Sequence, residues 1–356
     1  TETADFLLIG VILLAVIVRV NVAATVSVVW DELLYIQTGL NYTENLLSGD
    51  FNASSYSANY EHPDFAKLLI GFSVYLFTGK LNLPSVYVPE ILISARFAGI
   101  FVSLIAILAV FLFGRKVLGS GSLGLTASAI LALDPLFVYY GSIAYLDVPC
   151  SAFVSMSITL FAIAWKEKSV WKAVGSAVFM GLSISSKYLG LFSLMILATW
   201  LFSLFLIDLW SRQKKQMSPS ECPQDFPNLK LLLHSRFFWA IIAYLPIAFL
   251  VFYLTDPYIW QNTIRHLRRS ILFSVGHLQA GHGVALFERV SPNPPWYLWL
   301  VVLYTKTSEV QVILLTLGLP LLCLSVLKRQ YGSLLLLLWF FIPLAFLSYS
   351  SVTVSY

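Results

Sequence analysis

The chain carries few charges, and its acidic and histidine residues include two clusters whose chemistry stands out. The segment Trp30-Asp31-Glu32 directly follows the apolar run 6–29. The segment Glu61-His62-Pro63-Asp64 comes later in the same loop, with Lys67 one helical turn beyond it. Ionisable side chains at the edge of a bilayer are costly to keep and commonly functional. A carboxylate in this position can act as a general base on an acceptor hydroxyl or amine, so the pattern favours a membrane enzyme.

Each cluster also has a purely structural interpretation. An acidic pair at a helix end can serve only to meet solvent, which would leave Asp31 and Glu32 without a chemical role. Pro63 and Asp64 suit the first turn of a helix, where proline is tolerated and a negative charge is favourable. That structural role does not exclude chemistry by Glu61 and His62, which could bind a sugar, a phosphate or a metal.

Two further ionisable residues lie beside apolar runs. Asp147 opens one run in the segment Asp147-Val148-Pro149, where it would either cap a helix or line a polar pocket. Lys187 lies at a short break between two other runs. Its ammonium group could snorkel to lipid headgroups or bind a lipid-linked phosphate.

The segment 255–308 contributes a third group of candidates. Arg265, Arg268 and Arg269 fall within two turns of a helix, where they would form either an anion-binding face or a solvated amphipathic face. His282 lies in a turn-prone Gly-His-Gly triplet. Ligands for a divalent metal, if one binds, would be Glu61, His277 and His282. A site that requires no metal remains the default expectation.

Composition excludes a soluble domain. The chain is 58% hydrophobic and only 11% charged, against about 25% charged residues in a soluble domain, and its mean hydropathy is +0.81. Lipid must therefore solvate most of its surface. The net charge of +4 is small and gives no reason to expect nucleic-acid binding. The three cysteines are dispersed and predict neither a disulfide framework nor a metal site.

Apolar runs long enough to cross a bilayer predict an all-α, polytopic membrane protein. We expect a single transmembrane domain over 1–356 with about nine spans. The expected spans are 6–29, 90–113, 117–139, 147–165, 170–186, 188–209, 236–254, 309–327 and 332–350. Two shorter runs, 66–79 and 296–305, are expected to be interfacial or re-entrant helices. The last run ends close to Tyr356, which raises the expectation of further sequence beyond it.

The positive-inside rule assigns the loops to two faces. Basic residues occupy alternate loops, which predicts that those loops are cytoplasmic: Arg115, Lys116, Lys166, Lys168, Lys172, Arg212, Lys214, Lys215, Lys230, Lys328 and Arg329. The large loops 30–89 and 255–308 then share the extracytoplasmic face with all of the candidate site residues. A transporter or flippase, the alternative class, is expected to place polar groups on broken helices near the middle of the membrane. Only Arg19 and Arg96 come near that position.

The order of these motifs resembles that of the polyprenyl-phosphate-dependent glycosyltransferases of the GT-C fold, over about residues 5–300. The protein O-mannosyltransferases and the lipid A aminoarabinose transferases are the most similar. Those families carry an Asp-Glu motif at the first outer loop, matched by Asp31-Glu32. Their His-Pro-Pro or Lys-Pro-Pro motif resembles Glu61-His62-Pro63-Asp64 followed by Lys67. Asp147-Val148-Pro149 is similar to their Asp-Pro, and Lys187-Tyr188-Leu189-Gly190 to their Lys-Gly corner.

The resemblance implies a GT-C transmembrane bundle that moves a sugar from a dolichyl- or polyprenyl-phosphate donor to a protein or glycolipid acceptor, with inversion. Mannose is the favoured sugar, and a pentose is the other option. Asp31 would be the general base, with Glu32 and Asp147 as the next candidates. Lys187 and the arginines at 265, 268 and 269 would hold the lipid phosphate. The remaining residues of the pocket would be Glu61, His62, Asp64, Lys67 and His282.

Three departures from the family pattern bear on the acceptor. Asp64 replaces the second proline of the motif, and Gly190 is three residues past Lys187 rather than adjacent to it. The loop 255–308 is too short for the β-trefoil insert of the eukaryotic enzymes. The fold is less affected by these differences than the choice of acceptor is.

Overall fold

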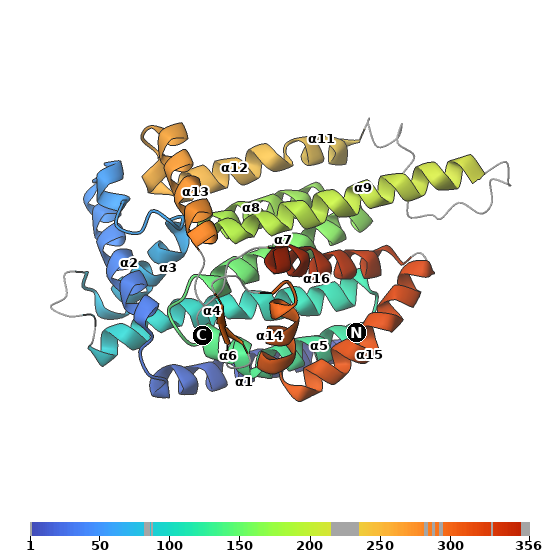
Figure 1. Cartoon of the computed structure of the whole chain (residues 1–356), viewed down its shortest axis with the longest axis horizontal. Coiled ribbons are helices and arrows are strands. Elements are labelled where there is room, and N and C mark those ends of the chain that lie inside the picture. The colour runs from blue at the N-terminus through green and yellow to red at the C-terminus, as the bar shows by residue number, and fades with distance from the viewer. Residues whose placement is uncertain are drawn as a thin grey trace.

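The structure is a computed structural model that describes residues 2–81, 86, 88–214, 235–280, 284–286, 289–291, 295–328 and 330–349. Its long helices run roughly parallel and form a bundle (Figure 1). They are α1 (Glu2–Thr25), α4 (Pro89–Leu112), α5 (Gly121–Leu133) with α6 (Pro135–Gly141), α7 (Asp147–Glu167), α8 (Val170–Ser186), α9 (Leu191–Lys214), α11 (Arg236–Ile242) with α12 (Tyr244–Thr255), α15 (Glu309–Leu327) and α16 (Tyr331–Tyr349).

The two large loops contain short elements that lie mainly at one end of this bundle. In the first loop these are α2 (Trp30–Ser48), the 3-10 turn η1 (Ala53–Tyr56) and α3 (Phe65–Thr78). The second holds the 3-10 turn η5 (Pro257–Ile259), α13 (Thr263–Ala280), an antiparallel hairpin of β1 (Val284–Leu286) and β2 (Arg289–Ser291), and α14 (Leu298–Lys306). Helices α2 and α13 lie across the end of the bundle in Figure 1.

Within the described residues, six helices are long and apolar enough to cross a membrane, or up to eight if each of two bent pairs is one span. These eight correspond to eight of the nine expected runs, and the all-helical, multi-pass bundle is confirmed. The remaining run is α8, which has 17 residues against the roughly 20 that a span needs. The expected short helix at 66–79 is α3, and the one at 296–305 is α14.

Proline explains both bent pairs. Helices α5 and α6 meet at 65° and α11 and α12 at 46°. Pro135 is the first residue of α6, and Pro246 lies in the first turn of α12. Proline cannot donate a backbone hydrogen bond and clashes with the preceding turn, so a helix must bend or restart there. The carboxylate of Asp134 caps the restarted helix by accepting from the Phe137 amide at 2.6 Å.

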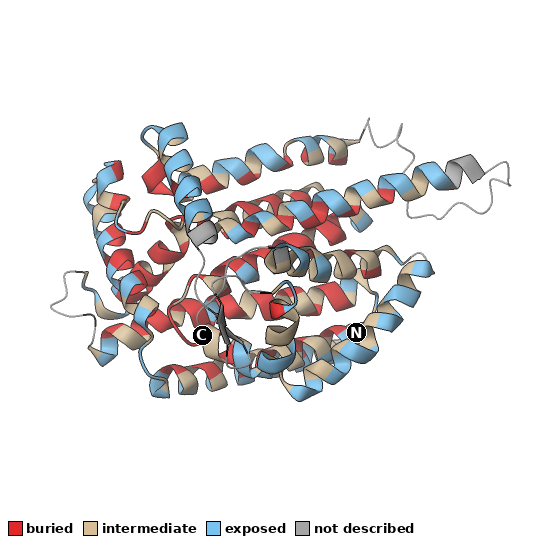
Figure 2. Ribbon diagram, viewed as in Figure 1, coloured by how far each residue is buried: buried red, intermediate tan, exposed pale blue. Residues whose placement is uncertain are grey.

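The core of the bundle is built around α4, α7 and α8, where buried residues concentrate (Figure 2). In the central stretch of α7, 78% of the residues are buried, whereas none are buried in that of α15. Small residues and hydroxyl groups bring the inner helices together, as is usual in membranes. The hydroxyl groups of Ser157, Ser176 and Tyr244 form one buried cluster that joins α7, α8 and α12. Helix α15 therefore lies on the surface of the bundle, where lipid can contact it, and α7 lies at the centre of the bundle.

Two glycines let α2 and α3 cross with their backbones in contact. A Cβ atom on Gly39 would overlap the backbone oxygen of Lys67, and one on Gly71 would overlap that of Gly39. Only glycine fits at such a crossing. The contact fixes the first loop as a pair of packed helices, which sets the direction in which the start of α2 faces.

Candidate active site

Glu32 is fully buried and anchors the start of α2. Its carboxylate accepts from Nε and NH2 of Arg96, each at 2.8 Å, and from the Ala144 amide at 2.9 Å. The same guanidinium group donates to the carbonyl oxygens of Ala23 and Val26 at the end of α1. This buried, two-pronged ion pair therefore closes the turn between α1 and α2.

Asp31, the neighbouring residue, is only half-buried. Its Oδ2 atom accepts a hydrogen bond of 2.6 Å from the hydroxyl group of Tyr145. The ring of Tyr35 meets that of Tyr145 edge to face, with centroids 5.4 Å apart. Burial raises the pKa of both phenols, and the Asp31 carboxylate raises both further. Tyr145 therefore remains a hydrogen-bond donor to Asp31 over the physiological pH range.

Glu61 and His62 lie on the other side of Tyr35. The His62 ring is tilted against that of Tyr35, with centroids 6.4 Å apart. Glu61 accepts from the Asn59 amide group at 2.9 Å. The negative charges of Asp31, Asp147 and Glu61 all add to the rise in the pKa of Tyr35, after burial. Carboxylates from three separate segments are therefore close enough to Tyr35 to affect its pKa.

Asp64 and Lys67 are both fully buried and pair with each other at 3.0 Å. The Lys67 ammonium group also donates to the carbonyl oxygens of Asn59 and His62, at 2.8 Å and 2.7 Å, and lies over the ring of Tyr42. These contacts hold the motif segment against the start of α3. In this structure neither side chain has a surface to offer a substrate.

The second loop attaches to the first through the same buried cluster. Asp64 accepts from the Tyr258 amide through Oδ2 at 3.0 Å. Asp256, at the end of α12, is also buried and hydrogen-bonds to Asp64. Burial and the nearby charge of Asp64 raise the pKa of Asp256 well above its usual range. Two carboxyl groups in contact are most stable when they share one proton, so we expect a shared proton in this contact, which joins the two loops.

Asp147 and Lys187 form an ion pair of 2.7 Å between the start of α7 and the end of α8. The Asp147 side chain is 44% exposed and that of Lys187 20% exposed. The N-cap position of α7 is occupied by Leu146, and Asp147 is the first residue of the helix. Unlike the Asp64–Lys67 pair, this pair can be reached from outside the bundle.

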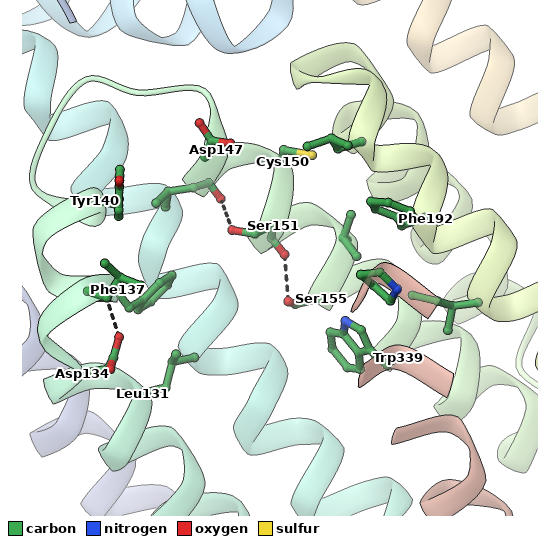
Figure 3. A pocket seen from close by; sticks show the side chains of 16 residues that line it. Leu131, Asp134, Phe137, Tyr140, Asp147, Cys150, Ser151, Ser155, Phe192 and Trp339 are labelled. Atoms are coloured by element: carbon green, nitrogen blue, oxygen red, sulfur yellow. Dashed lines mark hydrogen bonds between the residues drawn. The ribbon is translucent and has the colours of Figure 1, made fainter. Parts of the chain in front are cut away.

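An apolar groove opens directly beside Asp147 (Figure 3). It has a volume of about 490 Å³ and is bordered by α5, α6, α7, α9 and α16. Asp147 and Tyr140 lie at one end, and Trp339 of α16 lies farther along the wall (Figure 3). The residues between them are mostly aliphatic or aromatic. A long hydrocarbon chain could lie in this groove with its polar end at Asp147 and Lys187.

The basic residues of α13 do not reach this groove. Arg269 lies over the ring of Tyr60 at 4.5 Å, beside the Glu61 segment. Arg265 and Arg268 are exposed and do not line the groove. The side chain of His277 and the whole of His282 lie outside the described residues. No group of three potential metal ligands occurs among the residues that are described, and the metal site at Glu61 stays a prediction.

Four residues of this site were missing from the sequence-based candidates. Tyr35 could have been found, because it follows Asp31 by one helical turn and so shares its face of α2. Arg96 was noted only as a charge within a span, and Asp256 was not among the candidates. Tyr145 carries no sequence signal, because its contact with Asp31 joins positions far apart in the chain.

A helical membrane bundle with carboxylates gathered at one end, beside an apolar groove, has the architecture of the GT-C glycosyltransferases. Residues 8–255 match the family model of the dolichyl-phosphate-mannose-protein mannosyltransferases, and the chain belongs to that family. The expected kinship with the protein O-mannosyltransferases is thereby confirmed.

The fold is similar to a solved structure of that class, the S. cerevisiae protein O-mannosyltransferase Pmt1–Pmt2 complex bound to the sugar donor. The TM-score is 0.53 at 18% sequence identity, and the match covers 74% of this chain and 34% of that chain. The matched part therefore spans about a third of the length of that chain. No curated protein matches it.

Proposed function

We propose that this chain transfers mannose from a dolichyl- or other polyprenyl-phosphate to a hydroxyl group of a protein acceptor, with inversion at the anomeric carbon. Membership of the mannosyltransferase family supports mannose over a pentose and a protein over a glycolipid acceptor. The observation that carries the proposal is the position of Asp31. Its carboxylate is partly exposed, accepts a hydrogen bond from Tyr145, and shares with Asp147 and Glu61 an electrostatic influence on the same phenol, that of Tyr35.

Asp31 is the general base of this proposal. Its carboxylate takes the proton of the acceptor hydroxyl as the acceptor oxygen bonds to the anomeric carbon of mannose. The bond from that carbon to the phosphate oxygen breaks at the same time, and its electron pair leaves with the lipid phosphate. Glu32 is not available for this step, because both of its oxygens are taken up by Arg96 and by backbone amides.

The donor lies with its isoprenoid chain in the groove along α7. Its phosphate replaces Asp147 as the partner of Lys187, so that one anion is exchanged for another at little electrostatic cost. Fixed positive charge at the leaving phosphate stabilises the transition state. Arg269 is the one arginine of α13 that packs against the first loop, and it is a second candidate for contact with the sugar phosphate.

The acceptor approaches from the open side, where Glu61, His62 and Tyr35 form the wall. This end of the bundle is extracytoplasmic in our proposal. Basic residues gather at the opposite end of the same helices, where Lys166 donates to the carbonyl oxygen of Lys116. That charge asymmetry is typical of a cytoplasmic surface.

The decisive experiment is mannosyl transfer to a serine- and threonine-containing peptide, with the full chain in liposomes. Donors are dolichyl-phosphate mannose, dolichyl-phosphate glucose and a polyprenyl-phosphate pentose. We expect transfer from the mannose donor that is lost in Asp31→Asn. The matched control is Glu44→Gln, which removes an exposed carboxylate from the same helix and should leave turnover unchanged.

Two results would overturn the proposal. Full activity in Asp31→Asn would assign the base to another residue, with Asp147 tested next. Absence of both turnover and saturable donor binding in well-folded protein would refute the glycosyltransferase function, and uptake or flipping of lipid-linked substrates would then be measured. A polar pathway through the bundle has little support here, because Arg19 and Arg96 both donate to backbone carbonyls at helix ends or breaks.

A further inference from the structure

Helix α13 has an outward face on which basic and apolar side chains alternate. The face consists of Ile264, Arg265, Arg268, Ile271, Leu272 and Val275, all of them exposed. Ile264 is 84% exposed and Leu272 57% exposed. At 100° per residue these six positions fall on one third of the helix circumference. The helix contains no acidic residue. An exposed face of this composition is unusual for a helix that meets only water.

Contacts on the opposite side fix which way this face points. Ser270 donates to the carbonyl oxygen of Tyr60 and accepts from the hydroxyl group of Tyr188 at 2.7 Å. Ser274 donates to the carbonyl oxygen of Glu61 at 3.1 Å. His266 hydrogen-bonds through Nδ1 to the carbonyl oxygen of Tyr258 at 2.9 Å. These residues lie on the side of α13 away from Leu272. Rotating the helix to bury its apolar face would break their hydrogen bonds.

The outward face continues a surface that lipid must already cover. Helix α12 is part of a bent span, and it exposes Leu245, Phe249, Leu250 and Leu254 along its outer side. The turn η5 leads from the end of α12 directly into α13, which crosses the end of the bundle beside it (Figure 1). Exposed segments occur along both helices in Figure 2. Exposed apolar side chains are therefore found both on the bent span and on the helix that follows it in the chain.

We propose that α13 is an interfacial helix whose outward face rests on the bilayer, with Arg265 and Arg268 bound to the phosphate groups of anionic lipids. Its apolar side chains enter the boundary of the acyl chains, and the arginines extend along them to the headgroups. An acidic acceptor peptide is the competing occupant. It would satisfy the two arginines but leave Ile264 and Leu272 in water, so the membrane fits the whole face better.

The test places a photo-reactive benzoylphenylalanine at position 272 of the full chain in nanodiscs made of equal parts phosphatidylglycerol and phosphatidylcholine. The same group at Leu317, exposed on the span α15, is the lipid-facing control. At Ser54, exposed in the first loop, it is the aqueous control. We expect phospholipid adducts at 272 and 317 and none at 54. Adducts at 272 with an added acidic acceptor peptide or a second copy of the chain, or no lipid adduct there, would overturn the proposal.

The ratio of the two lipids in the adducts tests the arginines separately. The attraction between one basic side chain and an anionic membrane surface is about 1 kcal/mol, or about fivefold in binding. Phosphatidylglycerol should therefore be enriched severalfold at 272 relative to 317. Combining Arg265→Gln and Arg268→Gln should abolish that enrichment, whereas Lys80→Gln, which removes an exposed cation from the first loop, should preserve it. Equal ratios at 272 and 317 in the unaltered chain would refute the phosphate contacts, whether or not the protein is active.

Discussion

The ion pair between Glu32 and Arg96 makes the sharpest prediction about this site, because it separates a structural from a chemical role for the Asp-Glu motif. Glu32→Gln keeps the shape of the side chain but removes its charge. The new amide can still accept from the Ala144 amide, but its NH2 group would face either Arg96 or the Val29 amide, both of which are donors. Removing one partner of a buried ion pair costs about 3–5 kcal/mol. We expect the free energy of unfolding to fall by that amount.

The assay is reversible unfolding of the purified chain in mixed micelles, followed by circular dichroism. Asp31→Asn is the matched control, since it changes the neighbouring, partly exposed carboxylate and should alter the free energy of unfolding by about 0.5 kcal/mol or less. Glu32→Leu, Arg96→Leu and the double variant complete a double-mutant cycle. The coupling energy should be at least about 2 kcal/mol. The double variant should stay less stable than the unaltered chain, because Ala23 and Val26 lose the donor of their carbonyl oxygens.

The reasoning is wrong if Glu32→Gln unfolds with the same free energy as the unaltered chain while losing all turnover. That outcome would mean that Glu32 takes part in the reaction and that Arg96 holds it for that purpose. The reverse pattern, an active but destabilised variant, would establish Glu32 as the support of the loop. Asp31 would then be the only carboxylate of the motif with a chemical role.

Three further predictions follow from the buried cluster, from the crossing of α2 and α3 and from the proposed chemistry. In the unfolded state Asp256 loses its proton above about pH 4, whereas in the folded state its raised pKa keeps the proton bound. The contribution of Asp256 to stability therefore falls as the pH rises from about 4 to the raised pKa of the folded state. Asp256→Asn, which can still donate to Asp64, should flatten that dependence in a series of melting temperatures, and an unchanged slope would contradict the shared proton. Gly71→Ala should cost about 1–3 kcal/mol of stability, because its methyl group would overlap the backbone of Gly39. The control Gly10→Ala, with no atom within 4 Å, should be neutral or stabilising, and equal effects would show that the crossing tolerates a side chain. Finally, chelation of divalent metals should leave mannosyl transfer unchanged, and loss of transfer that zinc, magnesium or manganese restores would instead support the site at Glu61.

Hydropathy and proline placement were sufficient to predict the bundle. Lipid requires backbone hydrogen bonds to be satisfied within each span, so apolar runs translate directly into helices. The bend at Asp134 and Pro135 has a local cause, because a capping carboxylate before proline restarts a helix, but it was not among our expectations from the sequence. The sequence predicted that α8 belongs to the bundle. It did not show that this short helix is packed between neighbouring helices.

Contacts between distant segments could not be predicted in the same way. Asp64 and Lys67 were expected in the pocket because they belong to the segment that resembles the family's His-Pro-Pro motif. They are buried because α2 and α3 cross closely and because Asp256, which is distant in the sequence, packs against Asp64. A single sequence holds no record of such pairing. Spacing along a helix, in contrast, can be read from one sequence. The proximity of Tyr35 to Asp31 was therefore predictable, and that of Tyr145 was not.

Burial sorts the charges at this end of the bundle into two kinds. Two ion pairs are buried and have no contact with solvent: Glu32 with Arg96, and Asp64 with Lys67. Asp147 and Lys187 are paired but partly exposed, so a phosphate can take the place of the carboxylate. Before transfer the donor is a phosphodiester with one negative charge, and the leaving phosphomonoester carries up to two. In the proposed mechanism Lys187 would therefore bind the product phosphate more strongly than the donor, which would favour bond breaking and delay product release. Under this mechanism Lys187→Ala should slow the chemical step, while Asp147→Ala should chiefly strengthen donor binding.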